Sequence, residues 1–302
     1  MSVPPDVTVI GEALVDIVHA PDGTRSSPGG SPANVALALG RRGLRPMLVT
    51  QLADDAHGRD VTAWLTQSGV DVHVAGTPER TSTAVAHLDA AGAATYDFDI
   101  LWDPAPWNAP TGPVVHTGSI ATVLHPGADA VESALRTARA GSVVTFDPNV
   151  RPSLVTDADD VRARVARLVA LADVVKASGE DLDWLHPGRD HRDIAREWLA
   201  AGPSLVVVTE GGDGSFAAHA TGIVEQAARP VTVIDTVGAG DTFMAALIAG
   251  LHAPTAAEVR ARIAGFTAAD LTALLAAAAA AAAVTVSRPG ADPPWEAELA
   301  SS

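Results

Sequence analysis

The chain of 302 residues contains no cysteine. Disulfide bonds, thiolate metal sites, iron–sulfur clusters and cysteine nucleophiles are therefore excluded. Basic residues are also scarce, with 20 Lys and Arg against 36 Asp and Glu, and only Lys176 is a lysine. The net charge of −16 repels phosphate backbones, so we expect neither a nucleic acid nor an anionic membrane as a partner.

Long hydrophobic runs are absent as well. The longest apolar segment, residues 271–286, is shorter than the roughly 20 residues that a membrane span requires. It is built on the alanines at 276–283 and is predicted to be a buried helix. The N-terminal sequence lacks the basic region that precedes the apolar part of a secretory signal, so we expect a cytoplasmic protein.

Apolar residues make up 47% of the chain and fall into short runs that alternate with helical patterns. Strands are predicted at residues 7–10, 47–52, 113–119, 142–147, 172–178 and 204–210. Helices are predicted at residues 33–42, 54–67, 127–140, 158–171 and 192–200. Because the strand runs are continuously apolar, they indicate a parallel sheet covered by helices on both faces. Such a sheet binds its ligands beyond the carboxyl ends of its strands.

Two strand-like stretches, residues 13–27 and 81–98, have no helical pattern beside them. The second contains a hairpin signal, Asp-Ala-Ala-Gly, at residues 89–92. We expect these stretches to form a small antiparallel sheet, which is either a lid over a pocket or an ordinary edge hairpin. With no internal repeat or flexible linker, residues 1–302 are predicted to form a single domain whose lid spans about 12–28 and 80–110.

The segment IDTVGAGDTFMAALIAGL, residues 234–251, carries the strongest chemical signal. Gly238 and Gly240 allow successive backbone N–H groups to face one point, and the following helix adds its positive end. This arrangement suits a phosphate group. Asp241 would be repelled there unless it accepts a proton from an attacking hydroxyl or holds a metal. The alternative is that Asp241 only caps the helix.

The segment PGGSPANVALALGRRG, residues 28–43, predicts a glycine turn followed by a helix that starts at Ser31 or Pro32. The first turn of that helix carries Asn34, whose amide offers one acceptor and two donors for a polyol hydroxyl.

The segment TEGGDGSF, residues 209–216, follows a predicted strand. Thr209, Gly211 and Gly214 allow a close approach to a phosphate chain. The segment matches neither the dinucleotide-binding nor the Walker A pattern, so a bound nucleotide would be held by neither common fingerprint. The alternative is a glycine-rich hairpin.

In this order and spacing, the three segments resemble the ribokinase, or PfkB, family of carbohydrate kinases. The resemblance runs from GEALVDIV (11–18) to SRPGADPP (287–294). It implies an α/β, ribokinase-like three-layer sandwich with a central, mostly parallel sheet and a small β-sheet lid. It also implies phosphorylation of a sugar hydroxyl with ATP and Mg²⁺.

Two further segments, FDPNVRPSL (146–154) and KASGEDLDWL (176–185), resemble the fructokinase-like branch. This likeness implies that fructose is converted to fructose 6-phosphate. A kinase for 2-keto-3-deoxygluconate, ribose or a nucleoside remains an alternative. A non-catalytic sugar-binding regulator is an alternative of another class.

The resemblance also implies roles for individual residues. The catalytic base falls on Asp241, the anion hole on Gly238, Ala239 and Gly240, and a cation for the phosphoryl group on Arg151. Sugar-hydroxyl contacts fall on Asp16, Gly30 and Asn34. Nucleotide contacts fall on Lys176, Thr209, Gly211 and Gly214. Glu180 or Asp181 would orient a Mg²⁺-bound water, and Asp235 would help to hold a monovalent cation such as K⁺.

One position departs from the fructokinase-like pattern. Ala279 stands where such chains commonly carry an asparagine near the adenine, so a polar contact to the base is missing. The family resemblance further implies a homodimer formed through the lids.

Overall fold

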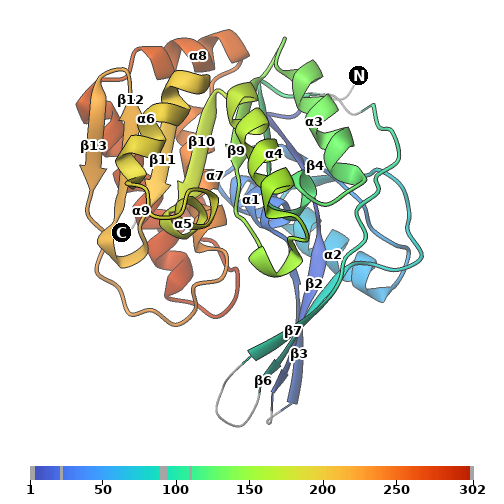
Figure 1. Ribbon diagram of the computed structural model, residues 1–302. Helices are drawn as coiled ribbons and strands as arrows, with labels where there is room; N and C mark the ends of the chain where they lie inside the picture. The colour runs from blue at the N-terminus through green and yellow to red at the C-terminus, as the bar shows by residue number, and fades with distance from the viewer. Residues whose placement is uncertain (1–3, 21–22, 89–93, 109–110, 300–302) are drawn as a thin grey trace.

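The computed structural model describes residues 4–20, 23–88, 94–108 and 111–299. These residues form a large β-sheet between two layers of helices, from which a smaller sheet projects (Figure 1). The strand order of the large sheet is β13-β12-β11-β10-β9-β8-β1-β4-β5. Its strands are β1 (Val7–Ile10), β4 (Pro46–Thr50), β5 (Asp71–Val74), β8 (Val114–Gly118), β9 (Val143–Asp147), β10 (Val174–Ser178), β11 (Leu205–Thr209), β12 (Ser215–His219) and β13 (Gly222–Gln226).

The strands β11, β10, β9, β8, β1, β4 and β5 run parallel, while β12 and β13 add an antiparallel edge. All residues of β1, β4, β8 and β9 are buried, as expected for strands with helices on both faces. The predicted α/β sandwich is therefore confirmed.

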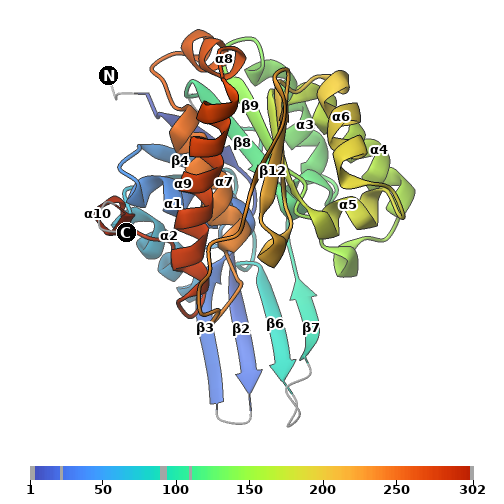
Figure 2. The same ribbon diagram turned by 90° about the vertical axis from the view of Figure 1, so that its left-hand side faces the viewer.

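One face of the large sheet is covered by α1 (Ser31–Arg41), α2 (Ala56–Gln67), α7 (Ala239–Leu251) and α9 (Ala268–Val286) (Figure 2). The other face is covered by α3 (Gly127–Ala138), α4 (Ala158–Leu171), α5 (Gly179–Leu185) and α6 (His191–Ala201). The remaining helices are α8 (Ala256–Ala264) and α10 (Glu296–Leu299), and single 3₁₀ turns occur at Ser119–Thr122, Pro152–Leu154 and Gly211–Asp213. Each helical layer encloses its own hydrophobic core.

The alanine-rich segment forms α9, which has 19 residues. By length and composition α9 could cross a membrane, and so could the bent pair α7 and α8 taken together. In the structure α9 packs along α7 and against β12 and β13. Leu271, Leu275, Ala278 and Ala281 are buried in this contact, whereas other side chains of α9 are half-buried or exposed. The predicted helix is present, but only one side of it is buried.

The small sheet consists of β2 (Leu14–Ala20), β3 (Gly23–Gly29), β6 (Thr83–Leu88) and β7 (Ala94–Asp99), in the order β3-β2-β6-β7. It extends away from the main body (Figure 1). The prediction of an antiparallel sheet is wrong, because the central strands β2 and β6 pair in parallel. Each of them leaves the body in the same direction, since α1, β4, α2 and β5 lie between them in the chain. The predicted hairpin turn at 89–92 lies outside the described residues.

Candidate active site

The glycine turns at residues 30 and 238 place the first turns of α1 and α7 next to each other. Gly30 precedes α1 with φ of 100°, and Gly238 precedes α7 in the left-handed region with φ of 76°. A Cβ at Gly30 would lie 2.7 Å from the carbonyl oxygen of Glu12, and one at Gly238 would lie 2.7 Å from Cβ of Ala291. Both positions therefore require glycine.

Asp241 occupies the third position of α7 and is only 6% exposed. Its Oδ1 accepts a hydrogen bond of 2.6 Å from the Ser31 hydroxyl, and its Oδ2 accepts one of 2.8 Å from Nδ2 of Asn34. Nδ2 of Asn149 donates to the Ser31 hydroxyl at 2.8 Å and lies 3.5 Å from Oδ1 of Asp241. Three polar side chains therefore hold this carboxylate in place.

The interpretation of Asp241 as a helix N-cap is wrong. The N-cap position is taken by Gly238, and the first turn of α7 has no side-chain cap. The amide of Ala239 donates to the carbonyl oxygen of Thr236 at 3.3 Å, and no side chain caps the other N–H groups of the first turn. Uncapped N–H groups at a helix start are suited to binding an anion. Gly238, Ala239 and Gly240 are half-buried, so this end of the helix remains accessible to a ligand beside the Asp241 carboxylate.

A second carboxylate, that of Asp16 in β2, comes to the site from the base of the small sheet. Burial raises the pKa of Asp16 to about 6, an effect that Arg151 opposes and Asp241 reinforces. These electrostatic effects mean that both residues lie close to Asp16. A Cβ at Gly29 would collide with the end of the Asp16 side chain, so the glycine in β3 leaves room for this carboxylate.

The turn after β9 brings Asn149 and Arg151 to the site. Asn149 has an unusual positive φ of 38°, and its Oδ1 accepts a hydrogen bond of 2.5 Å from Nη1 of Arg151. The turn is anchored by Asp181, whose Oδ1 accepts a hydrogen bond of 2.7 Å from the amide of Val150. Arg151 itself is exposed, which leaves its guanidinium accessible to a ligand.

Both carboxylate oxygens of Asp181 are engaged in structural hydrogen bonds. Its Oδ2 accepts hydrogen bonds from the amide and the hydroxyl of Ser178, which form the capping box of α5. Of the two acidic residues considered for a metal-bound water, only Glu180 is exposed on the first turn of α5.

Lys176 does not reach the surface where a nucleotide would bind. Its side chain is buried, and its ammonium donates a hydrogen bond of 2.8 Å to Oδ2 of Asp147. A direct contact to nucleotide phosphates, as expected from the sequence, is therefore not supported.

The other predicted nucleotide residues lie at the end of β11. The Thr209 hydroxyl is 3.5 Å from the carbonyl oxygen of Ala177 in β10. Gly211 and Gly214 have φ of 56° and 106°, and a Cβ at Gly211 would meet only open space. The backbone can therefore be approached closely at Gly211.

Asp235 lies in the loop before α7. Its Oδ1 accepts a hydrogen bond from the amide of Val237, and its Oδ2 accepts one of 2.8 Å from the amide of Gly290. The carboxylate therefore ties this loop to the segment that follows α9.

Nearly the whole chain matches a family model. Residues 4–298 fit the model described as pfkB family carbohydrate kinase. The chain belongs to this family. A fructokinase of Klebsiella pneumoniae is 38% identical over 263 residues, which are 82% of this chain and 84% of that protein.

Solved pfkB-type kinases have the same architecture. Fructokinase from Xylella fastidiosa with bound ATP superposes with a TM-score of 0.86 at 26% identity, covering 98% of both chains. A fructokinase double mutant from Vibrio cholerae O395 with bound fructose, ADP and potassium ion superposes with a TM-score of 0.83 at 27% identity, covering 99% of both chains.

The arrangement of this pfkB family site includes contacts that sequence reasoning missed. The sequence identifies Ser31 only as a helix start, and it presents Asn149 only as part of the segment 146–154. Both instead hydrogen-bond within the group around Asp241. The sequence offered one signal, the polar residues that directly follow the Gly-Gly turn and β9, but nothing in it pairs them with Asp241.

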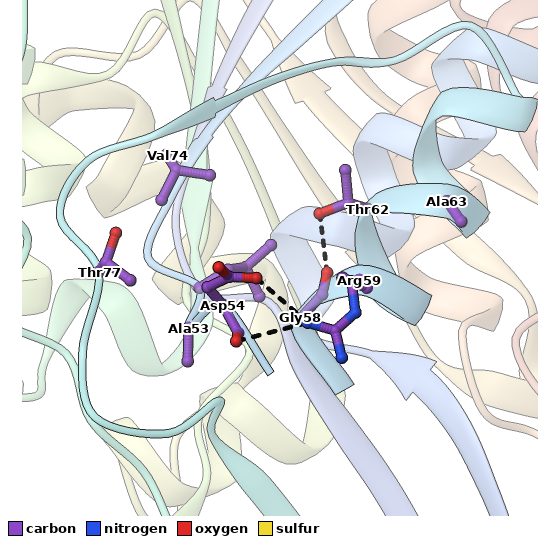
Figure 3. Close-up of a pocket in the computed structure, with 9 residues that line it drawn as sticks. Ala53, Asp54, Gly58, Arg59, Thr62, Ala63, Val74 and Thr77 are labelled. Atoms are coloured by element: carbon purple, nitrogen blue, oxygen red, sulfur yellow. Dashed lines mark hydrogen bonds and ion pairs between the residues drawn. The ribbon is translucent and has the colours of Figure 1, made fainter. Parts of the chain in front are cut away.

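A separate hollow of about 410 Å³ lies between the start of α2 and the end of β5 (Figure 3). Nη1 of Arg59 donates to Oδ1 of Asp54 at 3.1 Å, and the Thr62 hydroxyl donates to the carbonyl oxygen of Gly58. Its lining residues are Leu52, Ala53, Asp54, Gly58, Arg59, Thr62, Ala63, Val74 and Thr77. None of them is a predicted site residue, so we do not assign the kinase chemistry to this hollow.

Proposed function

We propose that this protein transfers the γ-phosphoryl group of ATP to fructose and forms fructose 6-phosphate and ADP. The observation that carries the proposal is the buried Asp241 carboxylate, held by Ser31 and Asn34 at the start of α7, which has no side-chain cap. Membership of the pfkB family and the likeness to fructokinases support the same reaction.

Asp241 is the general base of the proposed reaction. One of its carboxylate oxygens accepts the proton of the 6-hydroxyl of fructose, while that hydroxyl oxygen forms a bond to the γ-phosphorus. The bond from the γ-phosphorus to the ADP oxygen breaks, and ADP leaves with its electron pair. The hydrogen bonds from Ser31 and Asn34 fix the direction of the carboxylate, so little reorientation is needed before attack.

The charge of the transferring group is stabilised at the start of α7. The backbone N–H groups of Gly238, Ala239 and Gly240 belong to a helix end without a side-chain cap and carry its positive partial charge. Arg151, exposed at the same site, supplies a full positive charge.

The sugar binds against the base of the lid. Asp16 accepts hydrogen bonds from sugar hydroxyls, and the Gly30 turn allows the sugar to approach the backbone closely. The contacts of Asn34 change its expected role, because its Nδ2 donates to Asp241 while its buried Oδ1 has no hydrogen-bond partner among the described residues. We therefore assign a sugar hydroxyl to that oxygen alone.

The nucleotide extends from α7 toward Thr209, Gly211 and Gly214. Beside the anion hole, the loop before α7 exposes four large apolar side chains, which offer a surface for a planar base: Val231, Val233, Ile234 and Val237. Ala279 offers no polar contact, so we propose that the base is held mainly by apolar packing.

The described residues contain no group of three or more His, Asp or Glu side chains that could hold a metal by themselves. This fits a magnesium ion that is bound mostly by nucleotide phosphates and water, with Glu180 orienting one water. When bound, Mg²⁺ neutralises charge on the phosphates. Asp235 is our candidate for a K⁺ site, and a potassium ion is present in the related fructokinase from Vibrio cholerae.

The lid offers a surface for a second copy of the chain. Val18, Ala84, Ala86 and Phe98 share the lid face of Asp16, because paired residues lie on one face of a sheet. We propose a homodimer that packs these faces together in the cytoplasm. Light scattering on the purified protein tests it, and a mass of one chain at micromolar concentration would refute it.

The function is tested by measuring ADP release from MgATP with fructose, glucose, ribose, 2-keto-3-deoxygluconate, fructose 6-phosphate and adenosine, each with and without K⁺. The proposal predicts strong stimulation by fructose alone. Stimulation by another acceptor would keep the mechanism and correct the substrate. The absence of any stimulation, with ATP still bound, would favour a sugar-binding regulator.

A further inference from the structure

The only lysine of the chain lies behind the anion hole rather than in it. Lys176 stands in β10 and is 3% exposed. A Cβ placed on Gly240 would lie 3.0 Å from the Lys176 ammonium nitrogen, so this cation sits against the first turn of α7. The side chain is thus excluded from solvent but adjacent to the backbone that we propose binds the phosphoryl group.

Asp147 holds this cation in place. Its Oδ2 accepts a hydrogen bond of 2.8 Å from the ammonium, while its buried Oδ1 has no hydrogen-bond partner among the described residues. Burial by itself lowers the pKa of Lys176, but the hydrogen bond to Asp147 and the negative charges of Asp147, Asp181 and Asp241 together outweigh this and raise it. Lys176 therefore stays protonated.

The charged groups that face Lys176 come from several elements. Asp147, Asp181 and Asp241 all act on it electrostatically. His116 in β8 adds no positive charge, because burial together with the Lys176 charge lowers its pKa to about 3. Lys176 is thus the one buried cation among three acidic residues in this part of the described chain.

A purely structural role would not require such an arrangement. A buried ion pair loses much of its Coulombic gain to desolvation, and an apolar pair of similar volume often stabilises a protein equally well. The Asp147 oxygen without a partner adds a further cost. A cation beside a helix start, in contrast, adds directly to the positive potential of that helix end.

We propose that Lys176 is a positioning residue for phosphoryl transfer, which acts through the first turn of α7, and that Asp147 fixes its ammonium behind Gly240. The inference rests on the proposed kinase function. Lys176 would then act electrostatically from behind the backbone, without a direct contact to the nucleotide. The positive charge of its ammonium strengthens the anion hole when negative charge moves to the transferring group.

Kinetics of three variants separate this role from a structural one. Lys176→Met removes the cation, Asp147→Asn keeps it, and the double variant removes both charges together. The single Lys176→Met change leaves the Asp147 carboxylate buried and unpaired, so its folding is at risk. The double variant avoids that problem and is the decisive one, with folding checked by its circular dichroism and melting temperature. Arg196→Gln, which breaks an exposed ion pair with Asp193 on α6, is the control for loss of a cation.

The proposal predicts that the folded double variant loses about tenfold or more in kcat, with the KM for fructose changed by less than about twofold. Lys176→Arg should recover part of the lost kcat if it folds. A double variant that turns over at the wild-type rate would overturn the proposal, because only the pairing of Asp147 would then have mattered.

A second measurement needs no sugar. Lysine labelled with ¹⁵N gives one side-chain signal, because the chain has one lysine. The non-hydrolysable analogue AMP-PNP with Mg²⁺ should shift this signal more than MgADP does, since it adds the γ-phosphate. Equal shifts would overturn the role of Lys176. This arm stands even if fructose proves not to be the acceptor, so failure of the substrate assignment and failure of this inference are distinguished.

Discussion

Replacing Glu12 by glutamine should stabilise the protein, and the gain should grow as the pH rises. Glu12 follows β1 and is 3% exposed. Its Oε2 accepts a hydrogen bond of 2.9 Å from the amide of Ala121, whereas its buried Oε1 has no hydrogen-bond partner within the described part of the chain. A glutamine can keep the bond to Ala121 through its carbonyl oxygen and carries no charge at any pH.

The size and sign follow from the pKa of Glu12, which burial raises from 4.5 to about 7 against the hydrogen bond from Ala121 and the charge of Arg151. The folded state binds the proton more tightly than the unfolded state. The stability that this provides is present below about pH 4.5 and is lost as the pH rises through about 7. Relative to a side chain that never ionises, Glu12 therefore lowers the free energy of unfolding by about 1 kcal/mol near pH 5 and by about 3 kcal/mol near pH 8.5.

Urea denaturation of the wild type and Glu12→Gln across this pH range measures the difference. The gap in unfolding free energy should widen by about 2 kcal/mol between roughly pH 5 and 8.5. Glu79→Gln, at an exposed glutamate, is the control and should run parallel to the wild type. Parallel curves for Glu12→Gln as well would refute the reasoning.

Three other changes test the site. Ser31→Ala removes the 2.6 Å hydrogen bond to Asp241 and should lower kcat about tenfold or more with little change in the KM for fructose, as steady-state kinetics will reveal; an unchanged kcat contradicts the positioning role. Gly30→Ala forces a Cβ against the Glu12 carbonyl at a φ of 100°, so thermal melting should report a loss of about 1–3 kcal/mol, and an unaltered melting temperature argues against the strain. The kcat/KM for fructose should decline as the pH falls through about 6, because burial raises the pKa of Asp16 to about 6 and protonation removes an acceptor. Asp16→Asn should have a low kcat/KM that does not decline further as the pH falls through about 6. A decline that persists in this variant would count against Asp16 as the titrating group.

Sequence reasoning succeeded where the pattern is local. Six parallel strands, β1, β4, β8, β9, β10 and β11, were located to within two residues, because each is a continuous apolar run between turn residues. The edge strands β5 and β13 were not predicted, whereas the hairpin of β11 and β12 was the alternative interpretation of residues 209–216. Edge strands such as β5 and β13 are partly exposed and lack the apolar run that identifies a central strand.

The candidate site was predictable only in part for a similar reason. Asp241 is evident from its place after two glycines, a pattern contained within a few residues. Its hydrogen bond to Ser31 joins residues 210 positions apart, and that distance in the chain leaves no periodic signal. The lysine in an otherwise apolar strand signals a buried charge, but only the fold shows that Lys176 lies behind Gly240.

The central claim is that Asp241 accepts the proton of the attacking hydroxyl. Measuring phosphoryl transfer by the Asp241→Asn variant tests this claim most directly. The substitution keeps the size of the side chain but removes the carboxylate that accepts the proton. ADP release from MgATP with saturating fructose should fall by about 10²–10⁴-fold relative to the wild type, while fructose and ATP still bind. A variant that retains most of the wild-type kcat would contradict the account, because another group would then have to accept the proton.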